Sequence, residues 1–449
     1  MSPGIRSTLT VQAPAIFREV LKPTLLRDTA GTAGLNLGTL ALNFLITIVL
    51  SRLLGADGYG AYAFALAWAL LLSSVAGLGL SPLVIRQVAA SLTTRDWGVL
   101  RGMLRWSNAL VLVSGLGTTG AAGVVGYALL RDERDLLDPF LLGLLLVVPV
   151  SLTMLRQSAM QGLGRVILGR TPESLVAPGL FLALVAVVGP SMDDEFSSSW
   201  AMALQVLATM VAFAVGVLLL VRSLPDRGRT AQPEARAAHW RRAALPLLAL
   251  GLLLAANAQL GTIVLGAFGE PADAGVFSVA ARLTAFIGFV MLAATYPLMP
   301  LVARLHAEDD GPGLRLVVAR SARTIFLLSL PIGLLVVVLA EPLLRLFGAE
   351  FAVGTDAVRI LAVGEVVKAF VGLAGLVLVM VGHEARLTRA VGLGTGVNLA
   401  LALGLVPALG VEGAALAAVA GAVATQFLLE IDVRRRAGFS AAAFLARAR

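Results

Sequence analysis

Three charged residues lie inside apolar stretches that are long enough to cross a membrane: Arg282, Glu365 and Lys368. A charge at the centre of a spanning helix costs about 2.5–3.5 kcal/mol on insertion scales, so such residues usually face a cavity or a partner of opposite charge. Glu365 and Lys368 are spaced i, i+3 and share one face of a helix. Two hypotheses follow: the pair only neutralises itself for insertion, or it lines a water-filled cavity in which Glu365 binds a proton or a cation.

Arg282 differs because no acidic residue lies within its own segment. It either bonds to a carbonyl or to Glu365 on a neighbouring helix, or directs its charge at an anionic substrate, and we favour the second hypothesis. The weaker candidates for substrate binding are two arginines near helix ends and two amides in one segment: Arg52, Arg156, Asn257 and Gln259. Snorkelling to the interface would explain the arginines without a function, and amides commonly bond helices to one another.

The sequence predicts neither an enzyme nor a metal or cofactor site. It has no cysteine, and its three histidines, His239, His306 and His383, fall in separate predicted loops. It also has no phosphate-binding loop of the Gly-x4-Gly-Lys-Ser/Thr type and no polar stretch long enough for an ATPase domain. Any transport must therefore draw on a proton or sodium gradient, the membrane potential or the gradient of the substrate itself.

The segments that must hold these residues are transmembrane helices. Of the 449 residues, 58% are hydrophobic and 14% charged, and the mean hydropathy is +0.90, whereas soluble domains carry about 25% charged residues. The apolar runs are long and unbroken rather than alternating, which predicts spanning helices of about 20 residues. Twelve such segments can be delimited, at residues 31–53, 59–80, 106–130, 139–160, 173–190, 199–221, 245–268, 275–298, 322–340, 357–380, 390–408 and 411–431.

Basic residues are sorted by side of the membrane. With the N-terminus placed inside, 28 lysines and arginines fall on the cytoplasmic side and five on the opposite side, as the positive-inside rule requires. We therefore predict a multi-pass protein of the cytoplasmic (inner) membrane with both termini in the cytoplasm. The net charge of +8 then reflects contact with anionic membrane lipids and not with nucleic acid.

The second and eighth segments are similar at a shift of 215 residues, because Gly60-Ala-Tyr-Ala-Phe-Ala65 aligns with Gly275-Val-Phe-Ser-Val-Ala280. Both segments cross in the same direction, so the predicted fold is an all-α membrane protein of two six-helix lobes related by a parallel repeat. Such repeats place substrate sites between the halves. The predicted organisation is a cytoplasmic N-terminal segment at 1–29, an N-lobe at 30–222, a basic cytoplasmic linker at 223–244, a C-lobe at 245–432 and a basic cytoplasmic tail at 433–449.

Several motifs follow one another in a characteristic order and spacing. They include Arg52-Leu-Leu-Gly-Ala-Asp-Gly-Tyr-Gly-Ala-Tyr62, Gln161-Gly-Leu-Gly-Arg165 and Gly410-Val-Glu-Gly-Ala-Ala-Leu416. In these motifs the chain resembles the polysaccharide (O-antigen type) flippases of the multidrug/oligosaccharidyl-lipid/polysaccharide (MOP) exporter superfamily, over roughly residues 30 to 432.

The resemblance implies a MATE-like fold in which two lobes surround a central cavity and work by alternating access. It implies a substrate in which a saccharide is carried on a polyprenyl diphosphate, and as partners the membrane lipids, a polysaccharide polymerase and other proteins of the same biosynthesis. Related lipid II flippases carry a cavity arginine in an Ala-x-Arg-Leu context on the eighth helix. Ala280-Ala-Arg282-Leu283 matches that context.

The leading hypothesis is therefore a flippase for a polyprenyl-diphosphate-linked oligosaccharide in surface or exopolysaccharide biosynthesis. The alternative within transport is a multidrug/cation antiporter of the same superfamily. Cationic drugs would call for an acidic cavity, whereas the assigned membrane charges are two basic and one acidic. A membrane enzyme would need acidic or histidine clusters on a sizeable loop, and a non-transporting scaffold would leave Glu365 and Lys368 unexplained.

Overall fold

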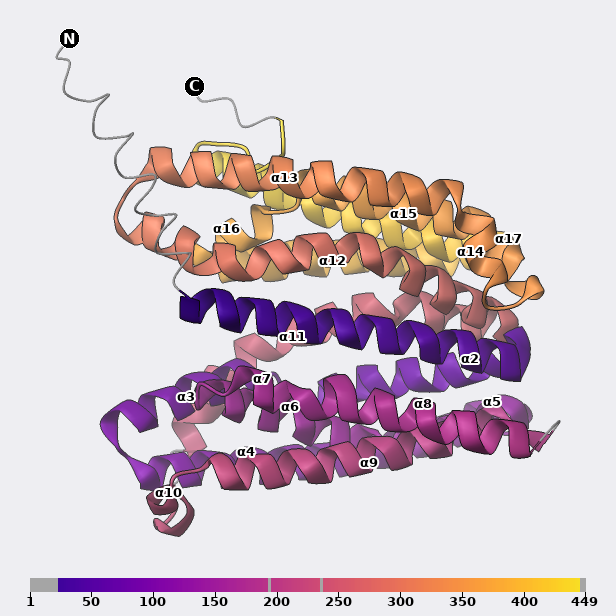
Figure 1. The fold of residues 1–449 in the computed structure, drawn as a ribbon, viewed down its shortest axis with the longest axis horizontal. Coiled ribbons are helices and arrows are strands. Elements are labelled where there is room, and N and C mark those ends of the chain that lie inside the picture. The colour runs from indigo at the N-terminus through magenta and orange to yellow at the C-terminus, as the bar shows by residue number, and fades with distance from the viewer. Residues whose placement is uncertain (1–22, 193–194, 235–236, 445–449) are drawn as a thin grey trace.

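The computed structural model describes residues 23–192, 195–234 and 237–444. Residues 1–22 of the predicted cytoplasmic N-terminal segment, and the last five residues of the predicted tail, lie outside these ranges. Within the ranges every regular element is helical. Figure 1 shows long, roughly parallel helices in two groups, with α3–α9 in one group and α12–α17 in the other.

The bounds of the elements agree with the hydropathy pattern. In chain order they are α2 (Pro23–Ala76), α3 (Ser81–Thr94), α4 (Trp97–Leu130), α5 (Arg134–Leu144), α6 (Val147–Gly162), α7 (Val166–Thr171), η1 (Pro172–Val176), α8 (Ala177–Val188), η2 (Gly189–Ser191), α9 (Ser198–Ser223), α10 (Asp226–Thr230), α11 (Ala237–Phe268), α12 (Pro271–Ala307), α13 (Gly311–Val338), α14 (Ala340–Arg345), η4 (Ala349–Gly354), α15 (Thr355–Val371), α16 (Ala374–Met380) and α17 (Glu384–Ala437).

Two of these helices, α2 and α17, have 54 residues each. At 1.5 Å per residue each would measure about 80 Å, far more than the roughly 30 Å of a bilayer's hydrocarbon core. Both are broken by a glycine with positive φ, Gly55 at 69° and Gly410 at 52°, a conformation that glycine adopts without a steric penalty. Figure 1 shows α2 turning back at its break, and in α17 the close approach of Gly394 to Gly421 places its two halves side by side.

These breaks account for the number of spans. The described residues contain nine helices long and apolar enough to cross a membrane, and ten when the bent pair formed by η4–α15 and α16 is counted as one span. Counting the halves of α2 and α17 separately then accounts for all twelve predicted segments. The prediction of an all-α, polytopic membrane fold is confirmed.

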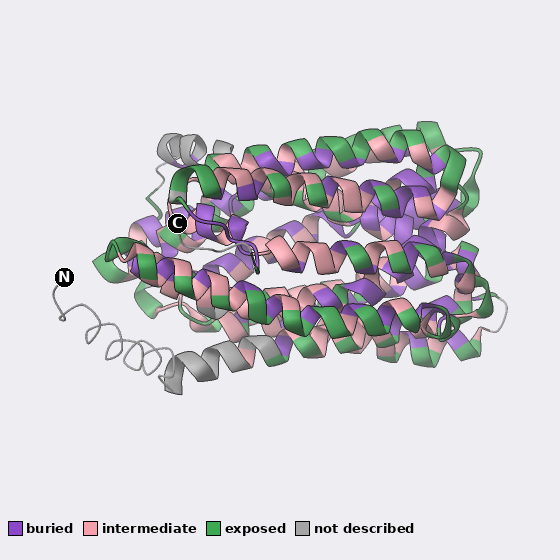
Figure 2. Cartoon of the chain, turned by 90° about the horizontal axis from the view of Figure 1, so that it is seen from above, coloured by how far each residue is buried: buried purple, intermediate pink, exposed green. Residues whose placement is uncertain are grey.

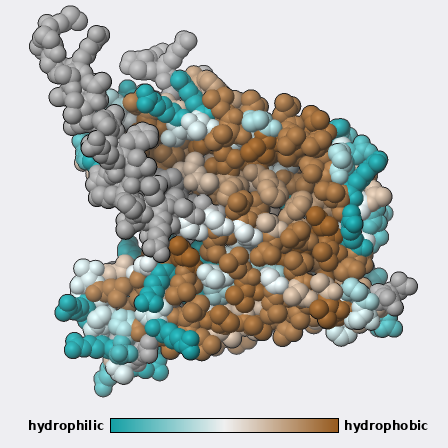
Figure 3. Space-filling view, viewed as in Figure 1, coloured by the Kyte–Doolittle hydropathy of each residue, from teal (hydrophilic) through white to brown (hydrophobic). Residues whose placement is uncertain are grey.

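The exterior of the helical body is apolar. Large side chains point outward along α4 and α13, with Val124 74% exposed, Leu129 77% and Leu334 62%, and Figure 2 shows exposed residues on the outer faces of the helices around a buried interior. In Figure 3 a broad hydrophobic band is bordered by hydrophilic residues at both ends of the helices. Lipid, not water, is the solvent that matches such a surface.

The internal repeat appears in the structure as a reciprocal contact. A Cβ atom at Gly60 would overlap the carbonyl of Pro271, and a Cβ atom at Gly275 would lie 2.7 Å from the carbonyl of Ala56. Gly60 and Gly275, and likewise Ala56 and Pro271, are equivalent under the 215-residue shift. The two halves therefore meet here in the self-complementary way of a two-fold axis, which supports the parallel arrangement predicted from the sequence.

Candidate functional site

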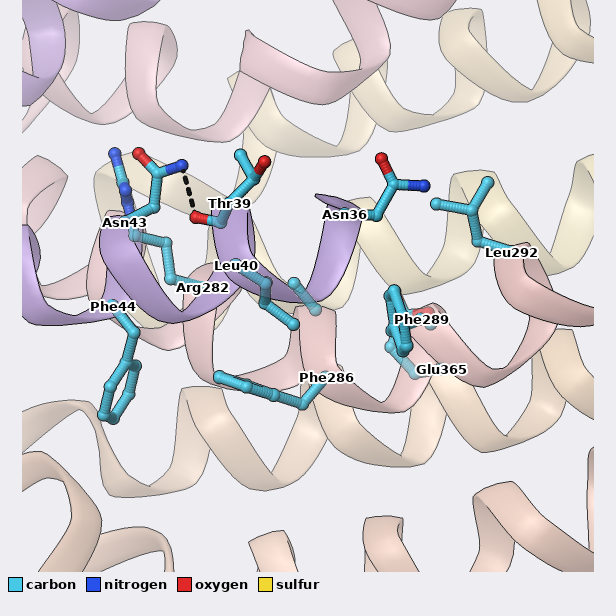
Figure 4. Close-up of a pocket in the computed structure, with 12 residues that line it drawn as sticks. Asn36, Thr39, Leu40, Asn43, Phe44, Arg282, Phe286, Phe289, Leu292 and Glu365 are labelled. Atoms are coloured by element: carbon cyan, nitrogen blue, oxygen red, sulfur yellow. Dashed lines mark hydrogen bonds between the residues drawn. The ribbon is translucent and has the colours of Figure 1, made fainter. Parts of the chain in front are cut away.

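A cavity of about 530 Å³ lies between the first half of α2, α12 and α15, and we call it the central cavity. Its lining is largely apolar, with a few polar groups that converge on it, as is usual for ligand sites. Figure 4 shows the lining residues of α2 and α12, two helices that run alongside each other. The lining residues are Asn36, Thr39, Leu40, Asn43, Phe44, Arg282, Ala285, Phe286, Gly288, Phe289, Leu292 and Glu365.

The wall formed by α2 carries a polar stripe. Asn36, Thr39 and Asn43 all line the cavity, and their i, i+3, i+7 spacing places them on one helix face. The Thr39 hydroxyl donates to the carbonyls of Leu35 at 2.8 Å and Ser174 at 3.1 Å, and Asn43 Nδ2 donates to the Thr39 carbonyl at 2.9 Å. The sequence analysis did not predict this stripe, although its spacing within an apolar run was a usable signal.

The part of the lining formed by α12 carries Arg282. Its side chain is partly exposed to the cavity, and within the described structure no hydrogen bond or ion pair satisfies its guanidinium. Of the two hypotheses for Arg282, the structure therefore agrees with a cation held available in a cavity and not with a bond to Glu365 or to a carbonyl.

Glu365 lies between the central cavity and a second cavity of about 270 Å³, which is enclosed by α11, α12, α15 and α17. We call the second space the C-lobe cavity. Glu365 forms an ion pair with Lys368 one turn along α15, and their side chains are 20% and 28% exposed. A Cβ atom at Gly288 would lie 3.1 Å from Glu365 Oε2, so this glycine allows the carboxylate to approach α12 closely.

Asn257 also lines the C-lobe cavity. Its Oδ1 accepts a hydrogen bond of 2.8 Å from Asn398 Nδ2 on α17, so it bonds two helices as well as facing the cavity. Gln259, two residues further along α11, lines neither cavity. The structure therefore brings Arg282 and Glu365 to one space, and Glu365, Lys368 and Asn257 to the other.

Arg52 lies away from both cavities, at the turn of α2. Its Nε donates to the Leu346 carbonyl at 2.8 Å, and the neighbouring Ser51 hydroxyl donates to the Phe347 carbonyl at 2.9 Å. Together with the contact between Gly60 and Pro271, these bonds join the turn of α2 to α12 and to the segment after α14. This end of the molecule, which is the outer side in the predicted topology, is closed.

Arg156 is also outside both cavities, and its predicted snorkelling to the interface is wrong. The side chain is only 3% exposed and forms an ion pair with Glu173, to which Gln157 Nε2 also donates at 3.1 Å. A Cβ atom at Gly216 on α9 would overlap the guanidinium. Glu173 lies in η1, a π-helical turn, and the widened turn together with Gly216 makes room for the pair inside the bundle.

Replacing Arg156 with leucine is expected to lower the stability of the protein by about 1–3 kcal/mol, because Glu173, whose side chain is only 22% exposed, then loses its counter-charge and keeps only the hydrogen bond from Gln157. The double variant Arg156→Leu/Glu173→Gln removes both charges and should recover most of that loss. Thermal unfolding in detergent, followed by loss of monodisperse protein, measures both. Arg165→Leu is the matched control, since Arg165 is exposed, and a single variant as stable as this control would contradict the prediction.

The comparisons with known proteins agree with this architecture. The model of a family described as "Polysaccharide biosynthesis protein" matches residues 25–306, and the MatE family model matches residues 246–403. The first match spans more than half of the chain and contains both Arg282 and the polar stripe of α2. No curated protein sequence matches the chain.

Solved structures share the fold. An inward-facing multidrug resistance MATE family transporter of the MOP superfamily aligns with a TM-score of 0.74 and 15% identity, over 89% of this chain and 94% of that one. The MATE multidrug transporter DinF-BH in complex with R6G aligns at 0.67 and 19%, over 93% and 96%. A MOP superfamily transporter from Pyrococcus furiosus aligns at 0.64 and 16%, over 91% and 95%. The chain belongs to the polysaccharide biosynthesis protein family and shares its fold with solved transporters of the MOP superfamily.

Proposed function

We propose that the protein is a flippase that moves a polyprenyl-diphosphate-linked oligosaccharide across the cytoplasmic membrane by alternating access, for surface or exopolysaccharide biosynthesis. The observation that carries the proposal is the guanidinium of Arg282, which lines the central cavity and forms no ion pair among the described residues. Arg282, Glu365 and Lys368 together leave one net positive charge at the two adjoining cavities. An anionic headgroup is the ligand that such a site favours.

A diphosphate cannot cross hydrocarbon unaided because burying an unpaired charge costs many kcal/mol. A guanidinium offers phosphate two parallel charge-assisted hydrogen bonds and would replace part of the headgroup's hydration. The amides and the hydroxyl of the stripe formed by Asn36, Thr39 and Asn43 line the same cavity as Arg282 and are suited to the hydroxyl groups of a sugar. The prenyl chain would remain in the bilayer.

The predicted topology gives the direction of transport. With both termini in the cytoplasm, the closed end at the turn of α2 faces outward, and the half of the cavity nearer the chain ends faces inward. The lipid-linked sugar would then enter from the inner leaflet, and opening of the contacts around Gly60 and Gly275 would release it to the outer leaflet. The two lobes, divided within the basic linker at 223–244, would move as the two bodies of this cycle.

Glu365 is the proposed point of coupling to a proton or sodium gradient, or to the membrane potential. It lies between the two cavities, beside α12, which carries Arg282. Protonation of Glu365, or binding of a cation by it, would release Lys368 as a second free positive charge. The ion pair would thereby couple the net charge at the two cavities to the proton or sodium gradient across the membrane.

The decisive experiment is leaflet exchange in reconstituted vesicles. The purified protein is placed in liposomes with a fluorescent undecaprenyl-diphosphate sugar, and a membrane-impermeant quencher reports the fraction in the outer leaflet. We expect the protein to make lipid in the inner leaflet accessible to the quencher, while a fluorescent neutral glycolipid in the same vesicles stays unaffected. Exchange of the neutral glycolipid at the same rate, or of neither lipid, would contradict the proposal.

A multidrug/cation antiporter remains the second candidate, because the solved relatives include multidrug transporters and because Glu365 reaches both cavities. Drug-resistance profiling of a strain that expresses the protein separates the two functions. Resistance to cationic drugs that is lost in Glu365→Gln and retained in Arg282→Ala would favour the antiporter. No resistance, together with exchange of the diphosphate lipid, would favour the flippase.

The double variant Glu365→Gln/Lys368→Met decides between the two hypotheses for this ion pair. It removes both charges while keeping side chains of similar size, so the stability of the fold should change little. If the pair lines a transport pathway, as proposed, exchange of the diphosphate lipid should fall about tenfold or more, since a hydrogen bond to a charged group contributes about 1.5–3 kcal/mol. Exchange at the wild-type rate would show that the pair serves insertion alone.

A further inference from the structure

The segment Gly438–Phe444 follows the last transmembrane helix and folds back against the helical body. Gly438 ends α17 with a φ of 69°, a left-handed conformation that turns the chain sharply. Phe439 and Ala443 are 6% and 0% exposed, and the residues between them are also buried. The three arginines just before the turn are exposed. A basic tail solvated throughout would not bury five consecutive residues, so this segment has a defined docking site.

One end of the segment is held by Glu430, a carboxylate that is only 7% exposed. Its Oε1 accepts a hydrogen bond from the Ser440 hydroxyl, and its Oε2 accepts one from the Ala441 backbone N–H at 3.1 Å. Arg434 Nε also donates to Oε1, at 2.7 Å. Glu430 is thus a buried charge with one partner on its own helix, Arg434, and two partners in the segment, and removing the segment would leave it without those two.

The other end reaches two helices that are distant in sequence. The Ala443 N–H donates to the Phe370 carbonyl at 2.9 Å, and the Ala443 carbonyl accepts from Arg323 Nε at 2.8 Å. The Phe444 ring lies 6.3 Å from the Phe370 ring and 5.7 Å from the Phe326 ring, and the Arg323 guanidinium lies 5.7 Å from the centre of Phe444. The segment therefore joins α13, α15 and α17.

The attachment to Phe370 is at a break in a transmembrane helix. α15 ends at Val371 and α16 begins at Ala374, and the two are bent by 43°. A helix end leaves carbonyls without an intrahelical donor, and in a membrane an unsatisfied carbonyl is costly. The Ala443 N–H supplies a donor to one of them, two residues beyond Lys368. The segment thus stabilises the bent form of the helix that carries the ion pair of Glu365 and Lys368.

We propose that Gly438–Phe444 is a strap that holds the α15–α16 bend and thereby positions Lys368 and Glu365 at the C-lobe cavity. Its hydrogen bonds and ring contacts within the described residues lie on α13, α15 and α17, so it acts within the C-terminal half of the molecule. The geometric part of this proposal is independent of the substrate, and only its consequence for transport rests on the proposed function.

Spin labels test the geometric part. Val363 on α15 and Ala385 at the start of α17 are both exposed, and the native chain has no cysteine, so the double variant Val363→Cys/Ala385→Cys carries labels on either side of the bend. In a chain that ends at Ala437 the bend should relax, and the mean distance between the labels should become longer and its distribution broader. A chain that ends at Phe444 keeps the strap and should give the full-length distribution.

A point variant tests the same contact in a full-length chain, in case the truncated chain does not fold. Phe444→Ala removes the ring that packs against Phe326 and Phe370, and should shift the label distance in the same direction. Phe427→Ala is the matched control, because this phenylalanine of α17 is 65% exposed and none of its described contacts involves the strap. Exchange of the diphosphate lipid should fall about tenfold with Phe444→Ala, since displacing a positioned group by about 1 Å can cost up to about 10²-fold.

The outcomes are distinct. A longer label distance with slower exchange supports the strap. An unchanged distance in both strap variants overturns it, whatever happens to exchange, and a longer distance with exchange at the wild-type rate overturns its positioning role. Failure of the unaltered full-length protein to exchange the lipid counts against the proposed function alone, because the label distances test the strap without any substrate.

Discussion

Replacing Arg282 with alanine is expected to reduce exchange of the diphosphate-linked sugar by about 100-fold or more. Each hydrogen bond between a charged donor and a charged acceptor contributes about 1.5–3 kcal/mol, and a guanidinium can offer two to one phosphate. Because Arg282 has no protein partner in the described structure, its removal exposes no unpaired carboxylate, and stability should stay close to that of the wild type. Transport and thermal unfolding, measured on the same preparation, separate the two effects.

The size of the effect should depend on the chemistry at this position. Arg282→Lys keeps the charge but loses the planar, bidentate geometry, so it should retain a small part of the exchange, and Arg282→Glu should retain none. Arg304→Ala is the matched control on the same helix, since Arg304 is exposed and pairs with Glu308 at 2.8 Å. If Arg282→Ala and Arg304→Ala exchanged the lipid at the same rate, a binding role for Arg282 would be ruled out.

Replacing Gly60 or Gly275 with leucine is expected to reduce lipid exchange about as strongly as Arg282→Ala does, but for a steric reason. At both positions a new side chain would meet the backbone of the opposite half, and a backbone cannot yield in the way that a flexible side chain can. Overpacking of a protein interior typically costs about 1–3 kcal/mol. Here the leucine would destabilise the conformation whose outer end is closed, because the glycine contact exists in that conformation. The variants should therefore populate forms in which this end stands open.

Cysteine labelling measures the shift. A cysteine in place of Ser51, which is 1% exposed, should resist a membrane-impermeant thiol reagent added from outside in the otherwise unaltered chain. It should react at least about tenfold faster when Gly60→Leu is present, corresponding to about 1.4 kcal/mol. Gly117→Leu on α4 is the control, because nothing lies within 4 Å of a Cβ atom there. Equal labelling in the two variants would show that the glycine contact does not hold the outer end closed.

The transmembrane fold could be predicted from the sequence because its main determinant is local. A run of about 20 apolar residues is sufficient to specify a spanning helix, and the count was correct even where α2 and α17 pass through a turn without a polar loop. The glycines at positions 55 and 410 were visible in the sequence. Their positive φ angles were not, because the conformation depends on the packing of the two helices that each glycine joins.

The residues of the site could be predicted only where a charged side chain interrupts an apolar run. Arg282 and the pair of Glu365 and Lys368 stand out because charge is rare within apolar runs, and the structure places all three at cavities. Arg156 misled us because its partner, Glu173, lies on another span, in a π-helical turn that hydropathy does not reveal. The docking of the segment after Gly438 was equally invisible, since alanine and phenylalanine in a basic tail carry no local signal of a binding partner.

The contact between Gly60 and Gly275 also bears on how such a chain could arise. Each half carries both surfaces of the contact, a glycine and, four residues before it, the carbonyl that the other glycine approaches. A chain of one half alone could therefore pair with a second copy of itself through the same patch, in the manner of a symmetric homodimer. Duplication and fusion of a gene for such a six-helix protein would preserve this glycine contact between the halves. Substitutions elsewhere could then differ between the two halves. The cavity shows that divergence: the α2 half contributes neutral amides and a hydroxyl, and the other half contributes the charges.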